Sequence, residues 1–226
     1  MLIAPKSVSD QLEDALASMK KALEKAKRKT GDCKLVAVSK THPIETIKKA
    51  LEFGHRAFGE NRIQEANSKW VELKKQYQGI ELHLIGSLQT NKVSTAVELF
   101  DVIETLDRFK LAKALKIEMD KQNRDVQLLI QVNTGGEEQK GGVLPKDLDA
   151  LMIYCKEDLG LFIKGLMCIP PVNAEPSMHF ALLYKLAKKY GLTSLSMGMS
   201  GDYDVAIQFG ATHIRVGTGV FGNRSL

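Results

Sequence analysis

One lysine in this sequence stands where its side chain could act as a nucleophile. Lys40 follows residues 34–39, KLVAVS, a largely apolar run that is typical of a buried strand. In most proteins a lysine at the end of such a strand is a solvated side chain that begins a loop. A lysine amine that is shielded from water has a lowered pKa and can form a Schiff base with an aldehyde or a ketone. The sequence around Lys40 leaves both interpretations open.

Two glycine-containing segments near the end of the chain could hold an anion. Ser200 and Gly201 follow the run SMGM, and Gly217 and Thr218 follow HIRV. Glycines let backbone amides approach an anion closely, and a hydroxyl group adds a further donor. Glycine is also common in such turns for steric reasons, so either segment alone is a weak signal. Together, after two successive strands, they predict a phosphate site that needs no lysine or arginine.

Arg215 is the most informative single side chain of the sequence. The alternation of residues along HIRV turns Arg215 toward the inside of a barrel and its two neighbours toward the surrounding helices. A guanidinium group inside a protein needs an acceptor. That acceptor is either a carboxylate of the barrel, such as Glu60 or Glu104, or an atom of a bound ligand.

Two further polar residues are weaker candidates. His83, within LHLIGS, also points inward, but a single histidine on a strand is more often a hydrogen-bonded core residue than a ligand-binding group. Asn61, in the turn FGENR, either donates a hydrogen bond to a ligand or caps the following helix. The histidines show neither the HxH nor the HExxH spacing, so no metal site is predicted.

Short apolar runs alternate with longer helical patterns along the whole chain, which is typical of an α/β protein with a parallel sheet. About eight strands are predicted, at residues 34–39, 56–58, 81–85, 101–104, 126–132, 163–168, 194–197 and 213–216. The number of these units favours a (β/α)8 TIM barrel, preceded by one extra N-terminal helix. No linker divides the chain, so residues 1–226 are expected to form a single domain.

In a barrel of this kind, ligands bind at the C-terminal ends of the strands, and phosphate is often held after the seventh and eighth strands. Lys40 follows the first predicted strand, and the two glycine-containing segments follow the last two. The predicted fold therefore brings the candidate amine and the candidate phosphate site to the same end of the molecule.

Composition limits the remaining possibilities. The three cysteines, Cys33, Cys155 and Cys168, are scattered and form no CxxC motif, so a reduced cytoplasmic location is expected. No apolar run has the length of a signal peptide or a membrane span. The net charge of +5 arises partly from residues 20–29, KKALEKAKRK, which lie opposite an apolar helix face. We expect a solvated helix face there and no nucleic-acid partner; an anionic partner such as RNA has only this charge in its favour.

Several longer motifs resemble those of one known family. The chain is similar to the pyridoxal 5′-phosphate (PLP) homeostasis proteins, which are single-domain relatives of the barrel domain of bacterial alanine racemase. The motifs that carry the resemblance are AVSKTHP (37–43), FGENRIQE (58–65), HLIGSLQTNK (83–92), IQVNTGGEEQKGG (130–142), GLMCIPP (165–171), LSMGMSGDYDVAI (195–207) and RVGTGVFGNR (215–224).

The resemblance implies a role for each candidate residue. It implies that Lys40 forms a Schiff base with the aldehyde of PLP and that Arg215 faces the pyridine nitrogen. The other cofactor-binding residues that it implies are Ser200, Gly217 and Thr218 at the phosphate, with Asn61 and His83 as further residues of the pocket.

The same residues favour a carrier over an enzyme. A guanidinium group beside the pyridine nitrogen disfavours the protonated ring that most PLP catalysis needs. An amino-acid racemase, the alternative function, needs two bases, and in alanine racemases the second is a tyrosine from a separate C-terminal domain of the partner subunit. This sequence ends at Leu226, soon after the last predicted strand. We therefore expect a monomeric PLP-binding protein without catalytic residues, with PLP-dependent apoenzymes as possible recipients and no membrane partner.

Overall fold

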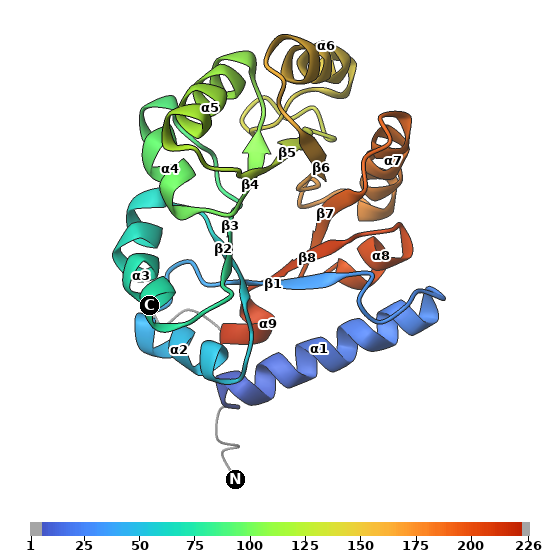
Figure 1. Ribbon diagram of the computed structural model, residues 1–226. Helices are drawn as coiled ribbons and strands as arrows, with labels where there is room; N and C mark the ends of the chain where they lie inside the picture. The colour runs from blue at the N-terminus through green and yellow to red at the C-terminus, as the bar shows by residue number, and fades with distance from the viewer. Residues whose placement is uncertain (1–5, 223–226) are drawn as a thin grey trace.

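The computed structural model describes residues 6–222, which form a closed barrel of eight parallel strands in the order of the sequence (Figure 1). This confirms the predicted fold class. The strands are β1 (Lys34–Val38), β2 (Ala57–Glu60), β3 (Glu81–Leu84), β4 (Val102–Leu106), β5 (Gln127–Gln131), β6 (Ile163–Met167), β7 (Ser194–Met199) and β8 (His213–Val216).

Helices surround the barrel, and β8 closes it by pairing with β1 (Figure 1). The α-helices are α1 (Val8–Lys25), α2 (Ile44–Glu52), α3 (Ile63–Gln76), α4 (Val93–Leu99), α5 (Phe109–Gln122), α6 (Leu148–Ile153), α7 (Pro176–Lys189), α8 (Tyr203–Gln208) and α9 (Thr218–Phe221). Three short helical segments complete the described elements: η1 (Thr90–Lys92), η2 (Pro145–Asp147) and η3 (Tyr154–Asp158).

The extra N-terminal helix, α1, lies along the outside of the barrel next to α2, α8 and α9 (Figure 1). It begins at a capping box in which Ser7 and Asp10 satisfy each other's backbone amides. Leu12 and Leu23 on its inner face are fully buried, while the lysines of its outer face are exposed, as the amphipathic pattern predicts. After the helix, Arg28 donates hydrogen bonds of 2.9 and 2.8 Å to backbone carbonyls near α8, so this member of the basic run has a structural function.

The strand positions agree with the predicted ones, and the clearest difference is at β2. The apolar run predicts a strand that ends at Phe58, whereas β2 continues through Gly59 to Glu60. Two backbone hydrogen bonds extend it: the amide of Ser39 donates to Gly59, and the amide of Ile85 donates to Glu60. A glycine followed by an acidic residue is typical of a turn, but here Glu60 is fully buried and is paired with a lysine from α3.

Between residues 6 and 222, no helix combines the length and the apolar character that crossing a bilayer requires. The cysteines Cys33, Cys155 and Cys168 are all buried and carry free thiols. Burial raises the pKa of each thiol to about 12, so these side chains act as small apolar residues of the core.

Candidate functional site

A pocket of about 320 Å³ opens at the C-terminal ends of β1, β2, β7 and β8. It contains six of the seven predicted site residues. The lining residues are Val38, Lys40, Asn61, Ile85, Ile169, Met199, Ser200, Gly201, Arg215, Gly217 and Thr218. The fold thus brings together an amine, two hydroxyl groups, an amide and a guanidinium group from four separate strand ends.

Lys40 is half-buried at the start of a tight turn after β1. The turn is attached to β2, because the Ser39 amide donates to the Gly59 carbonyl at 3.0 Å and the Ser39 hydroxyl donates to Glu60 Oε1 at 2.7 Å. Thr41 has a φ of 65°, a backbone conformation that is uncommon for a β-branched residue. The direction of the chain at Lys40 is therefore fixed by its neighbours.

Behind this turn lies a cluster of charges that the sequence analysis missed. Lys69 of α3 is almost fully buried; its Nζ lies 2.7 Å from Glu60 Oε1 and 2.9 Å from Glu65 Oε1. Burial alone would raise the pKa of Glu65, but hydrogen bonds from Lys69 and from the Thr41 amide lower it. The signal in the sequence was the spacing of Glu65 and Lys69, four residues apart on a helix that directly follows a predicted site residue.

The two glycine-containing segments meet at the pocket. A Cβ atom added to Gly219 would lie 4.0 Å from the Ser200 hydroxyl, so the segment after β7 and the segment after β8 are close together. Gly198 has a φ of 91°, and a Cβ atom there would lie 2.6 Å from the Ala206 side chain. Only glycine lets β7 bend this closely over α8. The side chain of Asp202 then accepts a hydrogen bond of 2.6 Å from the Met199 amide and fixes the segment that carries Ser200.

Arg215 lies where the pocket meets the barrel interior and is only 3% exposed. Its guanidinium group donates hydrogen bonds to the Ser196 hydroxyl at 2.6 Å and to the Cys168 carbonyl at 2.8 Å. It also lies 3.8 Å from a carboxylate oxygen of Glu104. Of the two carboxylates considered from the sequence, Glu104 is the partner, whereas Glu60 pairs with Lys69. The same arginine also lines the pocket, so its contacts with Ser196 and Glu104 leave part of it at the pocket surface.

A column of alternating charges runs from Arg215 through the barrel interior. The Ser196 hydroxyl donates a hydrogen bond of 2.5 Å to Glu104 Oε2. The other oxygen of Glu104, Oε1, lies 2.7 Å from His83 Nδ1, and Glu81 Oε1 lies 2.7 Å from His83 Nε2. At the far end, Lys34 pairs with Glu81 at 2.8 Å in the solvent-accessible part of the barrel. Barrel interiors are usually filled by layers of apolar side chains. Here Val102, Leu129 and Met167 form a small buried apolar cluster, with Ile169 packed against it.

The column fixes the protonation of its members. Burial alone would lower the pKa of His83, but hydrogen bonds to Glu104 and Glu81 raise it to about 8. The paired imidazolium lowers the pKa of Glu81 to about 2. Burial alone would raise the pKa of Glu104, but His83, Arg215 and the Ser196 hydroxyl together lower it to about 2. Burial lowers the pKa of neighbouring His213 to about 4, so His213 is neutral where His83 is charged.

The structure does not bring His83 to the pocket. Its two ring nitrogens are engaged by Glu81 and Glu104, and it is absent from the residues that line the cavity. The sequence analysis named this hydrogen-bonded core role as the alternative. Asn61, in contrast, does line the pocket, and Gly86 in the loop after β3 packs against it: a Cβ atom at Gly86 would lie 2.1 Å from the Asn61 carbonyl oxygen.

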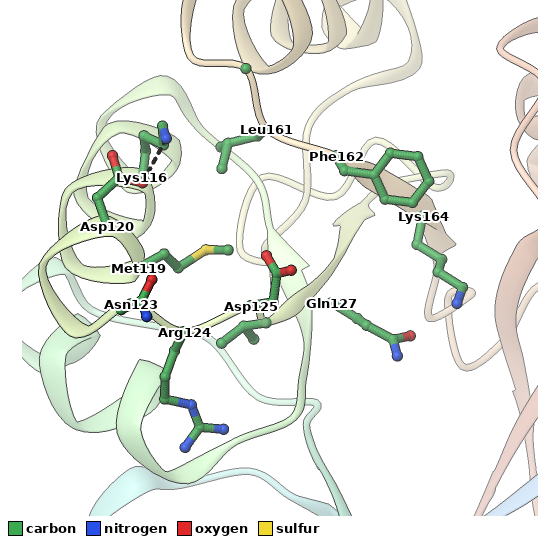
Figure 2. A pocket seen from close by; sticks show the side chains of 12 residues that line it. Lys116, Met119, Asp120, Asn123, Arg124, Asp125, Gln127, Leu161, Phe162 and Lys164 are labelled. Atoms are coloured by element: carbon green, nitrogen blue, oxygen red, sulfur yellow. Dashed lines mark hydrogen bonds and ion pairs between the residues drawn. The ribbon is translucent and has the colours of Figure 1, made fainter.

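A larger pocket of about 800 Å³ lies at the opposite end of the barrel, near the beginnings of β5 and β6 (Figure 2). It contains charged groups of both signs, including the Lys116–Asp120 ion pair of α5, and the exposed ring of Phe162. None of the predicted site residues lines it. In the part of the chain that the structure describes, no three His, Cys, Asp or Glu side chains are grouped so that they could hold a metal ion.

The fold and the site define a class of protein. Residues 15–225 match the family model of the alanine racemase N-terminal domain. Structures of alanine racemases have the same barrel: the enzyme of Clostridium difficile covers 93% of this chain with a TM-score of 0.69, at 11% identity and over 57% of its own length. At that identity the likeness concerns the fold alone. The chain belongs to the alanine racemase N-terminal domain family.

Its closer relatives define the family more narrowly. The pyridoxal phosphate homeostasis protein of Aquifex aeolicus is 41% identical over 95% of this chain and 97% of its own, and that of Vibrio cholerae is 39% identical over 97% of both. A structure of PipY from Synechococcus elongatus without PLP covers 96% of this chain and all of its own, with a TM-score of 0.85 and 36% identity. A second PipY structure has PLP bound and gives a TM-score of 0.81 at 35% identity, with the same coverage. The chain is a member of the pyridoxal phosphate homeostasis protein family, as the sequence motifs predict.

Proposed function

We propose that this protein binds PLP as a Schiff base on Lys40 and buffers or delivers it inside the cell. One observation carries the proposal: a single pocket of about 320 Å³ contains Lys40, the hydroxyl groups of Ser200 and Thr218, and Arg215. These side chains are complementary to three functional groups of PLP. The amine matches the aldehyde, the hydroxyl groups match the phosphate, and the guanidinium group matches the ring nitrogen. The relatives named as homeostasis proteins and the PipY structure with PLP bound support the same ligand.

Retention by a Schiff base is reversible, which suits a carrier. The Lys40 amine would attack the aldehyde carbon, a carbon–nitrogen double bond would replace the carbon–oxygen double bond, and the oxygen would leave as water. Water reverses the reaction and releases the ligand intact. The phosphate would be held by the Ser200 and Thr218 hydroxyls and by the amides around Gly217. Asn61 would contribute a further hydrogen bond at the edge of the pocket.

Arg215 would keep the bound cofactor weakly reactive. Its guanidinium group is buried, always charged, and held in place by Ser196 and the Cys168 carbonyl. A positive charge beside the pyridine nitrogen opposes protonation of the ring, which would supply the electron sink of PLP chemistry. The cofactor would then remain a good aldehyde for storage and transfer, with PLP-dependent apoenzymes as its recipients. We further propose a monomer located in the cytoplasm.

The racemase alternative requires a second base on the opposite face of the substrate carbon. Of the described residues that line the pocket, none is a tyrosine or a histidine. The lining of the pocket thus supports the proposal of a carrier without catalytic residues. Incubating the PLP-loaded protein with L-amino acids and following their optical activity tests this point: stable optical activity is expected, and its loss would establish a racemase.

The Schiff base is tested by reduction with borohydride after incubation with PLP. The protein is expected to gain the mass of one reduced adduct, and digestion should map it to Lys40. Lys40→Ala should lose both the adduct and the yellow absorbance, because no other amine of the chain lines this pocket in the described structure. Lys110→Ala, an exposed lysine shortly after β4, is the matched control and should keep both. An adduct on another residue, or an unchanged spectrum in Lys40→Ala, would refute the proposal.

A further inference from the structure

Two side chains of α3 hold the backbone on both sides of Lys40. The Nζ of Lys69 donates a hydrogen bond of 3.1 Å to the carbonyl oxygen of Ser39, the residue before Lys40. The Oε1 of Glu65 accepts a hydrogen bond from the amide of Thr41, the residue after it. Glu65 and Lys69 also form an ion pair of 2.9 Å with each other. One ion pair therefore joins the two peptide groups that flank Lys40.

The burial of this pair sets it apart from an ordinary helix ion pair. The Lys69 side chain is 7% exposed, and a lysine that is buried so deeply needs several acceptors. Elsewhere on α3, Glu72 and Lys75 form an ion pair of 2.7 Å with side chains that are 63% and 66% exposed. Well-packed apolar residues often replace buried ion pairs without loss of stability. Lys69 neutralises the buried carboxylate of Glu60, which is one reason for a lysine at this position, and its contact with the Ser39 carbonyl is a second reason that is specific to the turn.

The conformation of Thr41 shows why this contact matters. A β-branched residue at a φ of 65° is energetically unfavourable, and such conformations persist where the surrounding structure enforces them. The hydrogen bond from the Thr41 amide to Glu65 stabilises this conformation. The conformation of this turn determines the direction in which the Lys40 side chain extends from the backbone toward the pocket.

We propose that Glu65 and Lys69 are positioning residues that orient Lys40 for Schiff base formation. This inference rests on the proposed function of Lys40, and it adds residues outside the pocket to that function. Neither side chain lines the pocket, so neither is expected to contact the ligand.

The test measures equilibrium constants for Schiff base formation with two aldehydes, PLP and pyridoxal, which lacks the phosphate. Glu65→Ala is expected to lower both constants about tenfold and by the same factor, because the orientation of the amine affects the attack on either aldehyde. Ser200→Ala is expected to weaken PLP but not pyridoxal. Circular dichroism and the melting temperature show that each variant is folded.

Two variants separate positioning from a general effect of charge or helix stability. Glu65→Gln keeps a carbonyl oxygen that can accept the Thr41 amide, so it is expected to recover most of the loss seen in Glu65→Ala. Glu72→Ala removes the exposed acidic residue of the neighbouring pair on the same helix and is expected to match the unmodified protein.

The outcomes distinguish this inference from the proposed function. If borohydride leaves no adduct on Lys40 of the unmodified protein, the proposed function itself is wrong. If the adduct forms and Glu65→Ala binds both aldehydes as well as the unmodified protein, only the positioning role is wrong. A loss that affects PLP alone, or an equal loss in Glu65→Gln, would also overturn it.

If Glu65→Ala fails to fold, the double variant Thr41→Gly with Glu65→Ala provides the measurement. Glycine adopts a positive φ without strain, so the turn then depends less on Glu65. The double variant is expected to fold. Its equilibrium constants for Schiff base formation should be lower than those of Thr41→Gly by less than tenfold, and by the same factor for both aldehydes. A loss confined to PLP in this background would contradict the inference.

Discussion

At the scale of single residues, the pocket contains groups whose roles can be separated by experiment. Lys40 supplies the amine, Ser200 and Thr218 supply hydroxyl groups, and Arg215 supplies a fixed positive charge. The sequence predicted Lys40, Ser200 and Thr218 because they follow strand ends, and Arg215 because the alternation along its strand turns it inward. It named Glu104 and Glu60 as possible partners of Arg215 but could not choose between them, and it did not identify Ser196, since these contacts depend on the register of the strands in the closed barrel.

The hydroxyl groups can be tested apart from the amine. Ser200→Ala and Thr218→Val are each expected to weaken PLP retention by about 1–2 kcal/mol, the usual cost of leaving a polar partner without its hydrogen bond. The Schiff base should still form at high PLP concentration, and equilibrium dialysis measures the change in the dissociation constant. Thr193→Val, at the other end of the barrel beside β7, is the control and should bind normally. Complete loss of the Schiff base at saturation would show that the hydroxyls do not serve the phosphate.

The charge column predicts how stability depends on pH. The pKa of His83 is raised from 6.5 to about 8. The charged imidazolium therefore contributes fully to the free energy of unfolding below pH 6.5, and this contribution is lost as the pH rises through 8. We expect the free energy of unfolding to fall by about 2 kcal/mol over this interval, since one pKa unit corresponds to about 1.4 kcal/mol. Below pH 6.5, the free energy of unfolding falls because His213 binds a proton more readily in the unfolded chain than in the folded protein. Below pH 4.5, it falls further because Glu81 and Glu104 also bind protons more readily in the unfolded chain.

Urea unfolding at several pH values measures this dependence. His83→Gln should remove most of the fall between pH 6.5 and 8, whereas His179→Gln, at a histidine outside the column, should leave it unchanged. The same slope in His83→Gln and in the unmodified protein would mean that another group titrates in this range.

At the scale of elements, the site depends on how β7 turns into α8. Gly198 permits that turn through its positive φ and its contact with Ala206, and the segment with Ser200 follows directly. The pattern of apolar runs predicted the strand but ended it at residue 197, because Gly198 and Met199 carry no signal of a buried strand. The continuation of β2 to Glu60 was missed for a similar reason. In both places tertiary hydrogen bonds and packing decide the strand end.

Gly198→Ala tests the turn between β7 and α8. The added methyl group would lie 2.6 Å from the Ala206 side chain and 2.9 Å from the Tyr203 Cα, at a φ that L residues rarely adopt. We expect a loss of roughly 2 kcal/mol in the free energy of unfolding, together with weaker PLP retention. Gly201→Ala, where nothing lies within 4 Å of the added methyl group, should keep the stability of the unmodified protein. Equal stability of the two variants would argue against a strict need for glycine at 198.

At the scale of the whole molecule, the sequence predicted the closed barrel, its extra helix and the end at which the pocket lies. The apolar faces of the helices and the order of the strands are local signals, and the barrel follows from their alternation. The polar interior was only partly predictable: the alternation turned His83 and Arg215 inward, but Glu104 of β4 contacts Ser196 of β7 and Arg215 of β8 across the barrel, and these strands are far apart in the chain.

The N-terminal helix is expected to contribute substantially to the stability of the whole barrel. Leu23 is fully buried where α1 packs, and α1 contacts both α8 and α9. Leu23→Ala should lower the free energy of unfolding by about 2–5 kcal/mol, the usual range for emptying a buried leucine site. Lys21→Ala on the exposed face should change it by less than about 0.5 kcal/mol. If the two variants unfold at the same denaturant concentration, α1 does not support the barrel in solution.

The closure of the barrel between β1 and β8 also determines when the protein becomes competent during its synthesis. Lys40 follows β1, the first strand of the barrel in the sequence, and Thr218 follows β8, the last strand of the barrel. A nascent chain in which only the early strands have been synthesised contains the Lys40 amine but lacks the segment after β8 that is proposed to bind the phosphate. Capture of PLP in the proposed manner must therefore wait until the segment after β8 has been synthesised.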